Sequence, residues 1–316
     1  MIVTFGEALV DFIEQADGRF AAILGGSVCN FALASARQGL QVSYLNPLST
    51  DTFGQRFIDH LGSAGVILSN PMRSAMPTSL AIVTLDKNKL PTYVFHRESV
   101  ADRDIGSNEA AALMPEQIDL FHTGGLALVP EDCAKILAVI DAAASRGALI
   151  SVDANLRPLV CPDQRSYSAA VRRVLALAHL VKVSDEDLVH LGCGETDPVE
   201  AARTLFSGTN IQLIALTLGE RGAVLLSRSS RIDCPIPADV VVVDTVGAGD
   251  SFWAGLITGL QRRGMLDRDS LMRADQEALG YALRRAIASA SLNVMRAGCN
   301  PPTQGEVDVY MQQQSM

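Results

Sequence analysis

Apolar runs of strand length alternate with amphipathic segments of helix length along most of the chain. Near the N-terminus the order is a strand, a helix, a strand and a helix: MIVTFGEAL, NFALASARQGL, VSYLNPLS and FGQRFIDHLGSAG. The middle of the chain repeats this order in LFHTGG, CAKILAVIDAAASRG, ALISVDANL, SAAVRRVLALA, HLVKVS and IQLIALTLG. Because strands separated by helices pair in parallel, the pattern predicts an α/β fold with a central, mostly parallel sheet flanked by helices.

Two stretches break this alternation and predict a small accessory β-sheet. The first is DFIEQADGRFAAILGG, and the second, TSLAIVTLDKNKLPTYVFHRE, has the pattern of a hairpin that turns around DKNK. Together they place the accessory sheet at about residues 12–24 and 73–103. No fixed-period repeat or Pro/Ser-rich linker divides the chain, so we expect a single domain over residues 1–316.

Composition narrows the class of partner. With 316 residues, 48% of them hydrophobic, the chain can bury a large core, and its net charge of −9 argues against nucleic acid or an anionic membrane as a partner. The six cysteines form no CxxC pair and the five histidines show no close ligand spacing, which indicates a cytoplasmic protein without structural zinc. Glu7 and Asp11 interrupt the N-terminal apolar run, and no run reaches the roughly 18 to 20 residues of a membrane span. Small molecules are therefore the expected partners.

The stretch VVVVDTVGAGDSFWAGLITGL, residues 240–260, predicts a strand, a tight turn and a helix. Val240–Val243 have the pattern of a strand buried on both faces, and the glycines of Gly247–Gly249 permit a tight turn that another molecule can approach. Five apolar residues then fall on one side of a helix: Phe252, Trp253, Leu256, Ile257 and Leu260. Asp250 lies in the first turn of that helix, where free N–H groups and the helix dipole attract anions. This corner is therefore predicted to hold a phosphate.

Three familiar motifs do not fit the chain. The dipeptide Gly-Lys of a Walker A loop is absent. GAGDSF has Phe252 where a dinucleotide fingerprint needs its third glycine, and GGSVC has Cys29 where a nucleophile elbow needs its last glycine.

Five loops at predicted strand ends fall where open α/β sheets bind ligands: GEALVD, VDANLR, VKVSDED, TLGERGA and DTVGAGD. DTVGAGDSFWAGL resembles the C-terminal signature of the ribokinase-like, or PfkB, sugar kinases, and GGSVCNFALASARQGL resembles their N-terminal signature. The resemblance covers nearly the whole chain, and GEALVD, ADR and DANLRP are most similar to bacterial fructokinases. It implies an ATP-dependent sugar kinase that phosphorylates a primary hydroxyl of a monosaccharide.

The resemblance assigns roles at the corner. Asp250 would take the proton of the attacking hydroxyl, while the N–H groups of Gly247, Ala248 and Gly249 would form an anion hole. A competing interpretation is that Asp250 only caps its helix. We expect the helix N-terminus to favour the charged form of Asp250 and so to make it a weak base.

The family's sugar-binding positions match Asp11, Gly25, Gly26 and Asn30, with Arg97 and Arg157 as further candidates. The alternatives are that the glycines only form a turn, that Asn30 is a polar residue of a first helical turn, and that each arginine is a surface residue paired with an acid.

TLGERGA resembles the family's segment beside ATP, which assigns Thr217, Gly219 and Gly222 to the nucleotide together with Lys182; an ordinary turn would also account for the glycines. The family's NxxE reads SDED here, so Asp187 takes the Mg²⁺ position, through water. The family's monovalent cation site, which suits K⁺, matches two further positions: the side chain of Asp244 and the backbone of Val246.

Several alternatives stay open. A 2-keto-3-deoxygluconate kinase would need a cation facing the substrate carboxylate, which Arg97 or Arg157 could supply. A non-catalytic sugar sensor with this fold, or a nucleoside or phosphosugar substrate, is also compatible with the sequence. The accessory sheet is expected to be a lid that excludes water from the transferred phosphate. The other interpretations of that sheet are an extended sheet edge or a homodimer contact.

Overall fold

The computed structural model describes residues 1–15, 17–85, 91–194 and 197–314. Its main sheet has nine strands in the order β13-β12-β11-β10-β9-β8-β1-β4-β5. All neighbours pair in parallel except at one edge, where β12 pairs antiparallel with both β11 and β13. The predicted mostly parallel sheet is thus confirmed. The strands are β1 (Ile2–Thr4), β4 (Val42–Tyr44), β5 (Ile67–Leu68), β8 (Leu120–Gly124), β9 (Leu149–Asp153), β10 (Leu180–Ser184), β11 (Leu213–Thr217), β12 (Ala223–Leu226) and β13 (Arg231–Cys234).

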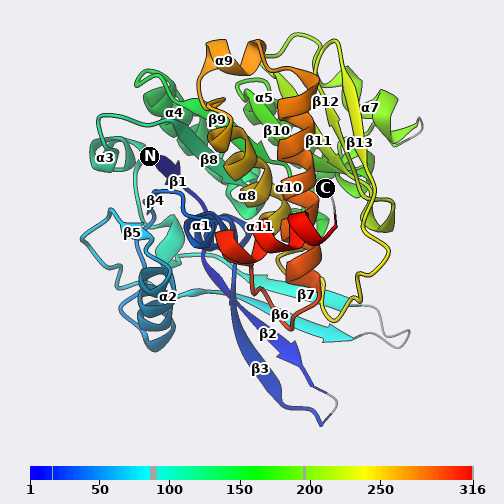
Figure 1. The fold of residues 1–316 in the computed structure, drawn as a ribbon. Helices are drawn as coiled ribbons and strands as arrows, with labels where there is room; N and C mark the ends of the chain where they lie inside the picture. Colours follow the sequence, from blue (N-terminus) through cyan, green and yellow to red (C-terminus); the bar gives the residue numbers. More distant parts are fainter. Residues whose placement is uncertain (16, 86–90, 195–196, 315–316) are drawn as a thin grey trace.

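Helices cover both faces of this sheet (Figure 1). In β10, Leu180 packs into one core and Val181 into the other, because successive residues of a strand point to opposite faces. The first face carries α1 (Ser27–Arg37), α2 (Thr52–Ser63), α8 (Ala248–Arg262), α9 (Arg268–Met272) and α10 (Gln276–Val294). The second carries α3 (Ser107–Leu113), α4 (Cys133–Ala144), α5 (Gln164–Leu175), α6 (Asp185–His190) and α7 (Pro198–Thr204), while α11 (Gln304–Gln313) packs on α10.

A second, four-stranded sheet projects from the main body (Figure 1). It has the order β3-β2-β6-β7, from β2 (Leu9–Glu14), β3 (Phe20–Gly25), β6 (Ser79–Leu85) and β7 (Pro91–His96). The accessory sheet was therefore predicted correctly, although it starts at Leu9 and its last strand ends at His96. The two strands around DKNK pair antiparallel as expected, whereas the turn itself falls at residues 86–90, outside the described residues.

The predicted strand at Val240–Val243 is wrong. These residues form an irregular segment between β13 and α8, and Val241, Val242 and Val243 are 71%, 59% and 62% exposed. The sheet already ends at β13, so no neighbouring strand pairs with them; the N–H of Val243 instead donates to the carbonyl of Val294 at the end of α10. An apolar run predicts a buried strand only where strand partners exist.

Two glycines of α8 allow this helix to pack closely against α10. A Cβ at Gly259 would lie 2.5 Å from the Cα of Ala282, and one at Gly255 would lie 2.9 Å from the Cα of Ala286. The same helix carries Asp250 in its first turn.

We therefore expect Gly259→Ala to lower the free energy of unfolding by roughly 1–3 kcal/mol, although alanine is the better helix former, because its methyl group meets the α10 backbone. Gly62→Ala in α2 is the matched control, since nothing lies within 4 Å of its Cβ position, and it should stabilise by roughly 0.5–1 kcal/mol. Urea denaturation of both variants checks this; equal shifts for the two would contradict the packing account.

Candidate active site

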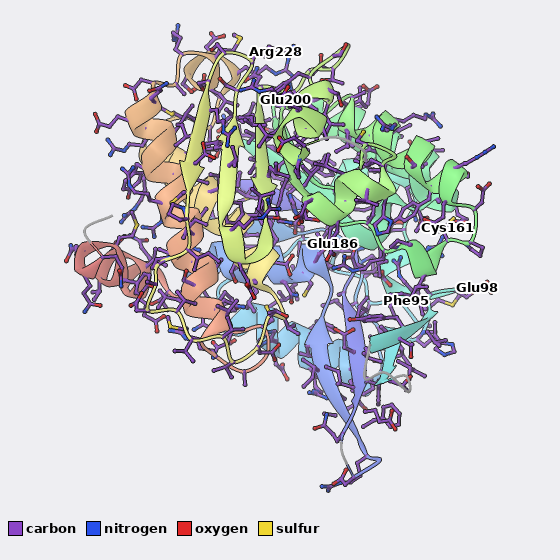
Figure 2. All side chains as sticks on the ribbon, turned by 90° about the vertical axis from the view of Figure 1, so that its right-hand side faces the viewer. Phe95, Glu98, Cys161, Glu186, Glu200 and Arg228 are labelled. Carbon is purple, nitrogen blue, oxygen red and sulfur yellow. The ribbon has the colours of Figure 1, made fainter. Side chains whose placement is uncertain are left out.

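A cavity of about 330 Å³ lies between the small sheet and the ends of the parallel strands of the main sheet. Figure 2 labels Phe95 on β7 of the small sheet and Glu186, which follows β10 of the main sheet, near the junction of the two sheets. Strand β2, strand β7, the loop after β9, strand β10 and the start of α8 all reach this cavity. Its wall thus includes Asp11, Tyr93, Phe95, Gly26, Asn30, Asn155, Arg157, Lys182, Gly247, Ala248, Gly249 and Asp250.

The corner before α8 has the predicted turn and helix. Gly247 precedes the helix with a φ of 73°, a left-handed conformation that glycine adopts readily. A Cβ there would also collide with the Sγ of Cys299. Asp250 lies in the first turn, 9% exposed, and its Oδ2 accepts a hydrogen bond of 2.9 Å from Nδ2 of Asn30. No side chain caps α8, so the interpretation of Asp250 as a helix cap is wrong.

The environment of Asp250 favours a stronger base than expected. Burial and the charge of Asp153 raise the pKa of this carboxyl, the Asn30 hydrogen bond and the charges of Lys182 and Arg157 lower it, and the net pKa is about 7. The expectation of a weak base is therefore wrong, because desolvation outweighs the helix N-terminus. A carboxylate with a pKa near neutrality suits proton abstraction at physiological pH.

Lys182 lies directly behind the turn. Its Nζ pairs with both carboxylate oxygens of Asp153, at 2.9 and 3.0 Å, and both side chains are buried. Burial lowers the pKa of Lys182, but Asp153 and Asp187 raise it overall, so the ammonium stays charged. A Cβ at Gly249 would lie 3.2 Å from this Nζ, so glycine lets the ammonium approach the turn closely.

Four of the predicted sugar positions come together in the cavity wall or beside it. Burial raises the pKa of Asp11 and the nearby charge of Arg157 partly offsets this, with a net pKa of about 6. Gly25 lies against Asp11, since a Cβ there would be 2.6 Å from its Oδ2, and Gly26 has a φ of 102° at the start of α1. Asn30 follows one turn later and contacts Asp250.

The two arginines predicted as sugar ligands lie in different surroundings. Arg97 does not line this cavity; it is buried, pairs with Asp102 at 2.9 Å and donates to the carbonyl of Leu126 at 2.7 Å. Arg157 is exposed and lines the cavity, and its Nη1 donates to the carbonyl of Leu156. Only Arg157 is placed to face a ligand here.

The TLGERGA residues lie at the same edge of the sheet but outside the cavity wall. Thr217 ends β11 beside Ser184, Gly219 begins a 3₁₀ turn with a φ of 56°, and Gly222 has a φ of 89°. A Cβ at Gly222 would collide with the carbonyl of Cys234. Local geometry accounts for both glycines, and their contact with a nucleotide stays a prediction.

The proposed metal ligands are already engaged within the protein. Asp187 is buried and its carboxylate accepts the N–H groups of Ser184 at 2.8 Å and Leu156 at 2.7 Å, forming a capping box at α6. Within the described residues no cluster of three or more acidic, histidine or cysteine side chains is arranged to hold a metal ion. The Mg²⁺ role of Asp187 remains a prediction that this geometry does not favour.

The monovalent cation positions are engaged as well. Asp244 accepts the N–H groups of Val246 at 3.0 Å and Gly298 at 2.8 Å. The carbonyl of Val246 accepts Nδ2 of Asn293 at 2.8 Å. These bonds hold the loop in front of α8, and a cation bound here would have to share the same oxygens.

Sequence reasoning missed several cavity residues. Glu7 is buried and its Oε1 accepts the N–H and hydroxyl of Ser27, at 3.0 and 2.9 Å, at the start of α1. Asn155 lines the cavity with a φ of 38°. Both stand in loops singled out as GEALVD and DANLRP, so the signal was their place at a strand end. Tyr93 and Phe95 could have been found from the period-2 pattern of β7.

The sequence profile described as "pfkB family carbohydrate kinase" matches residues 1–305. The chain belongs to this family. As a PfkB carbohydrate kinase, it is a phosphotransferase that acts on a sugar hydroxyl. The resemblance given by its two signature motifs is thereby confirmed. In the described part of this kinase, no helix has the length and apolar character to cross a bilayer.

Related proteins point to one subgroup of PfkB kinases. A fructokinase from Rhizobium leguminosarum bv. trifolii is 32% identical over 285 residues, covering 88% of this chain and 85% of the relative. Probable fructokinase-4 from Arabidopsis thaliana is 31% identical over 318 residues, covering 97% and 95%.

Similar solved structures also include fructokinases. A fructokinase with bound ATP from Xylella fastidiosa has a TM-score of 0.88 and 27% identity, covering 100% of this chain and 99% of that one. A fructokinase from Vibrio cholerae O395 in its fructose, ADP and calcium-bound form has a TM-score of 0.82 and 25% identity, covering 98% of both chains. The ribokinase-like fold class is confirmed.

The raised pKa of Asp250 predicts a pH-dependent stability cost. Its pKa is about 7 in the fold against 3.8 ordinarily, so between these values the native state holds a proton that the unfolded chain has released. The free energy of unfolding must therefore fall as pH rises through this window.

Asp250→Asn removes the cost, so at pH 8 it should be more stable than wild type, on the order of 2–4 kcal/mol, with the gain vanishing near pH 4. Denaturant unfolding at both pH values measures the difference. A gain independent of pH would show that the carboxyl is not strained by burial.

Proposed function

We propose that this chain is an ATP-dependent fructokinase that transfers the γ-phosphoryl group to a primary hydroxyl of the sugar. The observation that carries this proposal is the buried carboxylate of Asp250, with a pKa near 7, at the N-terminus of α8 and in the wall of the cavity. The fructokinases among its relatives, one with bound ATP and one with bound fructose and ADP, support the choice of substrates.

The residues at the corner divide the work of phosphoryl transfer. Asp250 takes the proton of the attacking hydroxyl, which the Asn30 hydrogen bond helps by fixing the carboxylate. The N–H groups of Gly247 and Gly249 at the start of α8 would stabilise negative charge on the phosphate oxygens, whereas the N–H of Ala248 already donates to the carbonyl of Thr245 at 3.2 Å. Lys182 adds a positive charge behind them, held in place by Asp153. The protein therefore has to rearrange little to stabilise the charge of the transferred phosphoryl group.

Mg²⁺ is expected with ATP, because it usually binds through phosphates, waters and one or two carboxylates. The described residues offer no dedicated ligand cluster, and Asp187 is committed to two backbone N–H groups. We assign no catalytic step to a protein-held Mg²⁺, nor to K⁺ at Asp244 and Val246, whose oxygens already accept hydrogen bonds.

The charge of the cavity favours a neutral sugar over a sugar acid. Glu7, Asp11 and Asp250 place three carboxyl groups in its wall. Of the two cations there, Lys182 is paired with Asp153, which leaves Arg157 alone to face a substrate carboxylate. Arg97, the other candidate for an acid substrate, is neutralised by Asp102. A 2-keto-3-deoxygluconate carboxylate would have Arg157 as its one unpaired cation, among carboxyl groups whose own negative charge burial already disfavours.

A substrate panel tests the proposal. In a coupled ADP-release assay, D-fructose should give the highest kcat/KM and 2-keto-3-deoxygluconate at most a hundredth of it, because binding the acid requires desolvating a carboxylate among other carboxylates. Turnover of the acid but not of fructose would contradict the fructokinase proposal and leave the kinase family intact. A wild-type chain that binds sugar yet turns over none in the panel would favour the sugar sensor.

Asp250→Asn should retain ATP and fructose binding and lose about 10²–10⁴-fold in kcat, because asparagine keeps the shape and the Asn30 contact but cannot accept the proton. Rapid-quench measurement of sugar phosphate and isothermal titration of both substrates check this.

The matched control is Asp267→Asn. Asp267 caps α9 through the N–H of Ser270, so its loss should leave kcat unchanged. Near wild-type turnover of Asp250→Asn would exclude Asp250 as the base.

A further inference from the structure

The chain crosses between the main body and the small sheet four times, and each crossing has a polar side chain beside it. Glu7 precedes β2, Ser27 follows β3, Ser79 begins β6 and Arg97 directly follows β7. Glu7, Ser79 and Arg97 are 2%, 0% and 6% exposed. Polar groups buried together at the root of a sheet need partners, and their partners show what holds the sheet in place.

One carboxylate joins the second pair of crossings. Asp102 pairs with Nη2 of Arg97 at 2.9 Å, and its other oxygen accepts the hydroxyl of Ser79. Nη1 of Arg97 donates to the carbonyl of Leu126, which follows β8 of the main sheet, at 2.7 Å. The Arg97–Asp102 pair therefore ties the start of β6 and the end of β7 to the main body.

The same Asp102 also reaches the first pair of crossings. Its carbonyl accepts Nδ2 of Asn46 at 2.8 Å, and Oδ1 of Asn46 accepts the N–H of Gly6 at 2.7 Å. Glu7, the next residue, holds Ser27 through its Oε1. All four crossings thus belong to one hydrogen-bonded root, and Glu7 connects that root to the wall of the sugar cavity.

Two buried polar atoms at the root have no partner among the described residues: Oε2 of Glu7 and Nε of Arg97. Both residues line a small cavity of about 10 Å³, close to the least volume that holds one water molecule. The wall of this cavity has as many acidic as basic residues: Glu7, Asp102 and Asp132, and Arg97, Arg103 and Lys135. This balance of charge favours a neutral molecule over an ion. A water would donate to Oε2 and accept from Nε.

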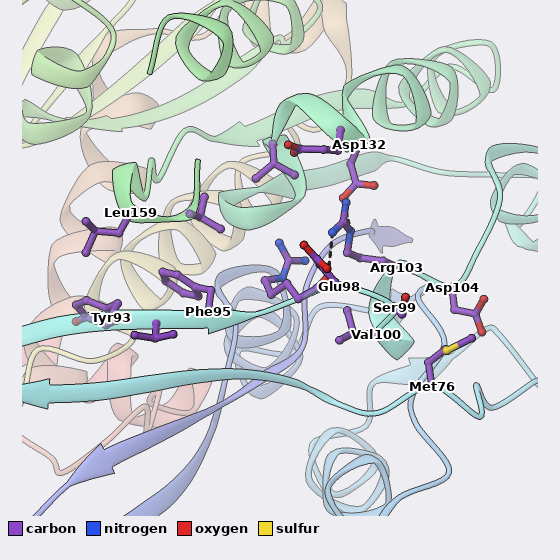
Figure 3. Close-up of a pocket in the computed structure, with 15 residues that line it drawn as sticks. Met76, Tyr93, Phe95, Glu98, Ser99, Val100, Arg103, Asp104, Asp132 and Leu159 are labelled. Carbon is purple, nitrogen blue, oxygen red and sulfur yellow. Dashed lines mark hydrogen bonds and ion pairs between the residues drawn. The ribbon is translucent and has the colours of Figure 1, made fainter. Parts of the chain in front are cut away.

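The outer side of the root faces a groove of about 850 Å³ along β7. Figure 3 shows Arg103 beside Asp132 at one end of this groove and Tyr93, Phe95 and Leu159 at the other. Arg103 pairs with Asp132 at 2.8 Å, and its Nη1 donates to the carbonyl of Arg97 at 2.9 Å. The backbone of Arg97 is therefore held from outside while its side chain is held from within.

We propose that the Arg97–Asp102 pair, joined to Glu7 through one water molecule, is a latch that fixes the small sheet over the sugar cavity. Arg97 and Asp102 are then positioning residues and not sugar ligands. This inference rests on the proposed kinase function, because the latch acts by holding Asp11, Tyr93 and Phe95 of the small sheet opposite Asp250. With the latch broken, sugar is held less well and water reaches the transferred phosphate.

The test replaces the pair by apolar residues of similar size, Arg97→Met with Asp102→Leu, because a buried ion pair exchanged for apolar side chains often leaves the fold intact. We expect the KM for fructose to rise at least about tenfold, and ADP to form in excess of sugar phosphate, while the variant stays folded. The wild type should give one ADP per sugar phosphate.

The matched control removes an ion pair away from the small sheet, Arg285→Met with Asp308→Leu in α10 and α11, where Arg285 is buried and the partly exposed Asp308 also pairs with Arg262. It should change thermal stability but neither the KM for fructose nor the ratio of ADP to sugar phosphate. A folded Arg97/Asp102 variant with wild-type KM and ratio would overturn the latch. If that double variant does not fold, Arg97→Lys replaces it, because lysine keeps the charge but cannot make the same hydrogen bonds. The KM for fructose and the ratio of ADP to sugar phosphate should then rise to a smaller degree. Wild-type values of both in Arg97→Lys would also overturn the latch.

Two readouts do not depend on turnover. Amide hydrogen exchange of residues 6–9 and 97–103 should be faster in the Arg97/Asp102 variant than in the wild type, and unchanged in the control. Equal exchange in the variant and the wild type would overturn the latch, whether or not the wild type phosphorylates a sugar. A wild type that phosphorylates no sugar would refute the proposed function and leave the exchange result standing. A crystal structure should show a water between Oε2 of Glu7 and Nε of Arg97, and a direct contact between the two side chains would overturn that part of the proposal.

Discussion

A charged group taken out of water must be paired, hydrogen-bonded or neutralised, and the region where the two sheets meet is arranged around this constraint. Lys182 and Asp153 neutralise each other, Arg97 and Asp102 do the same, and Asp187 is satisfied by two backbone N–H groups. The carboxyl groups of the cavity wall are less well satisfied: burial raises the pKa of Glu7, Asp11 and Asp250. Asp250 is the one among them at the start of α8. It receives one hydrogen bond from an amide and no direct cation, so its pKa rises to about 7. A buried carboxylate with so little support is able to accept a proton near neutral pH.

The fold places that carboxylate through backbone contacts. Parallel strands bring their carboxyl ends to one edge, so the loops after β9 and β10 and the start of α8 converge although they are far apart in the sequence. The glycines of α8 let it lie close to α10, which fixes the helix whose first turn holds Asp250. The small sheet supplies the opposite wall, and its position depends on the buried residues at its root.

Much of this could be predicted from the sequence, and the failures share a cause. The periodicity of the strands and helices, and the signature motifs, were enough for the fold class, the accessory sheet and the family. Of the positions assigned to the sugar, Asp11, Gly26 and Asn30 lie together in the cavity wall, and their contact with a sugar stays a prediction. The strand expected at Val240–Val243 failed because pairing partners are a tertiary property that an apolar run does not contain. The pKa of Asp250 failed for a related reason: the helix N-terminus is visible in the sequence, whereas the depth of burial that outweighs it is not. Arg97 was placed at the sugar because its partner Asp102 could not be identified from spacing alone.

Close packing of bare backbone explains how the corner can act without rearranging. The Cα of Gly247 lies against Cys299, Gly249 lies against the ammonium of Lys182, and Gly26 lies 2.6 Å, measured from its Cβ position, from the carbonyl of Glu7. Each contact excludes a side chain, and the hydrogen bond from the N–H of Ala248 to the carbonyl of Thr245 fixes the same turn. Donors held in place before the phosphate arrives stabilise its charge without a reorganisation cost. These glycines therefore matter to the corner through close packing as much as through conformational freedom, since an added methyl group would meet Cys299, the ammonium of Lys182 or the chain at Glu7.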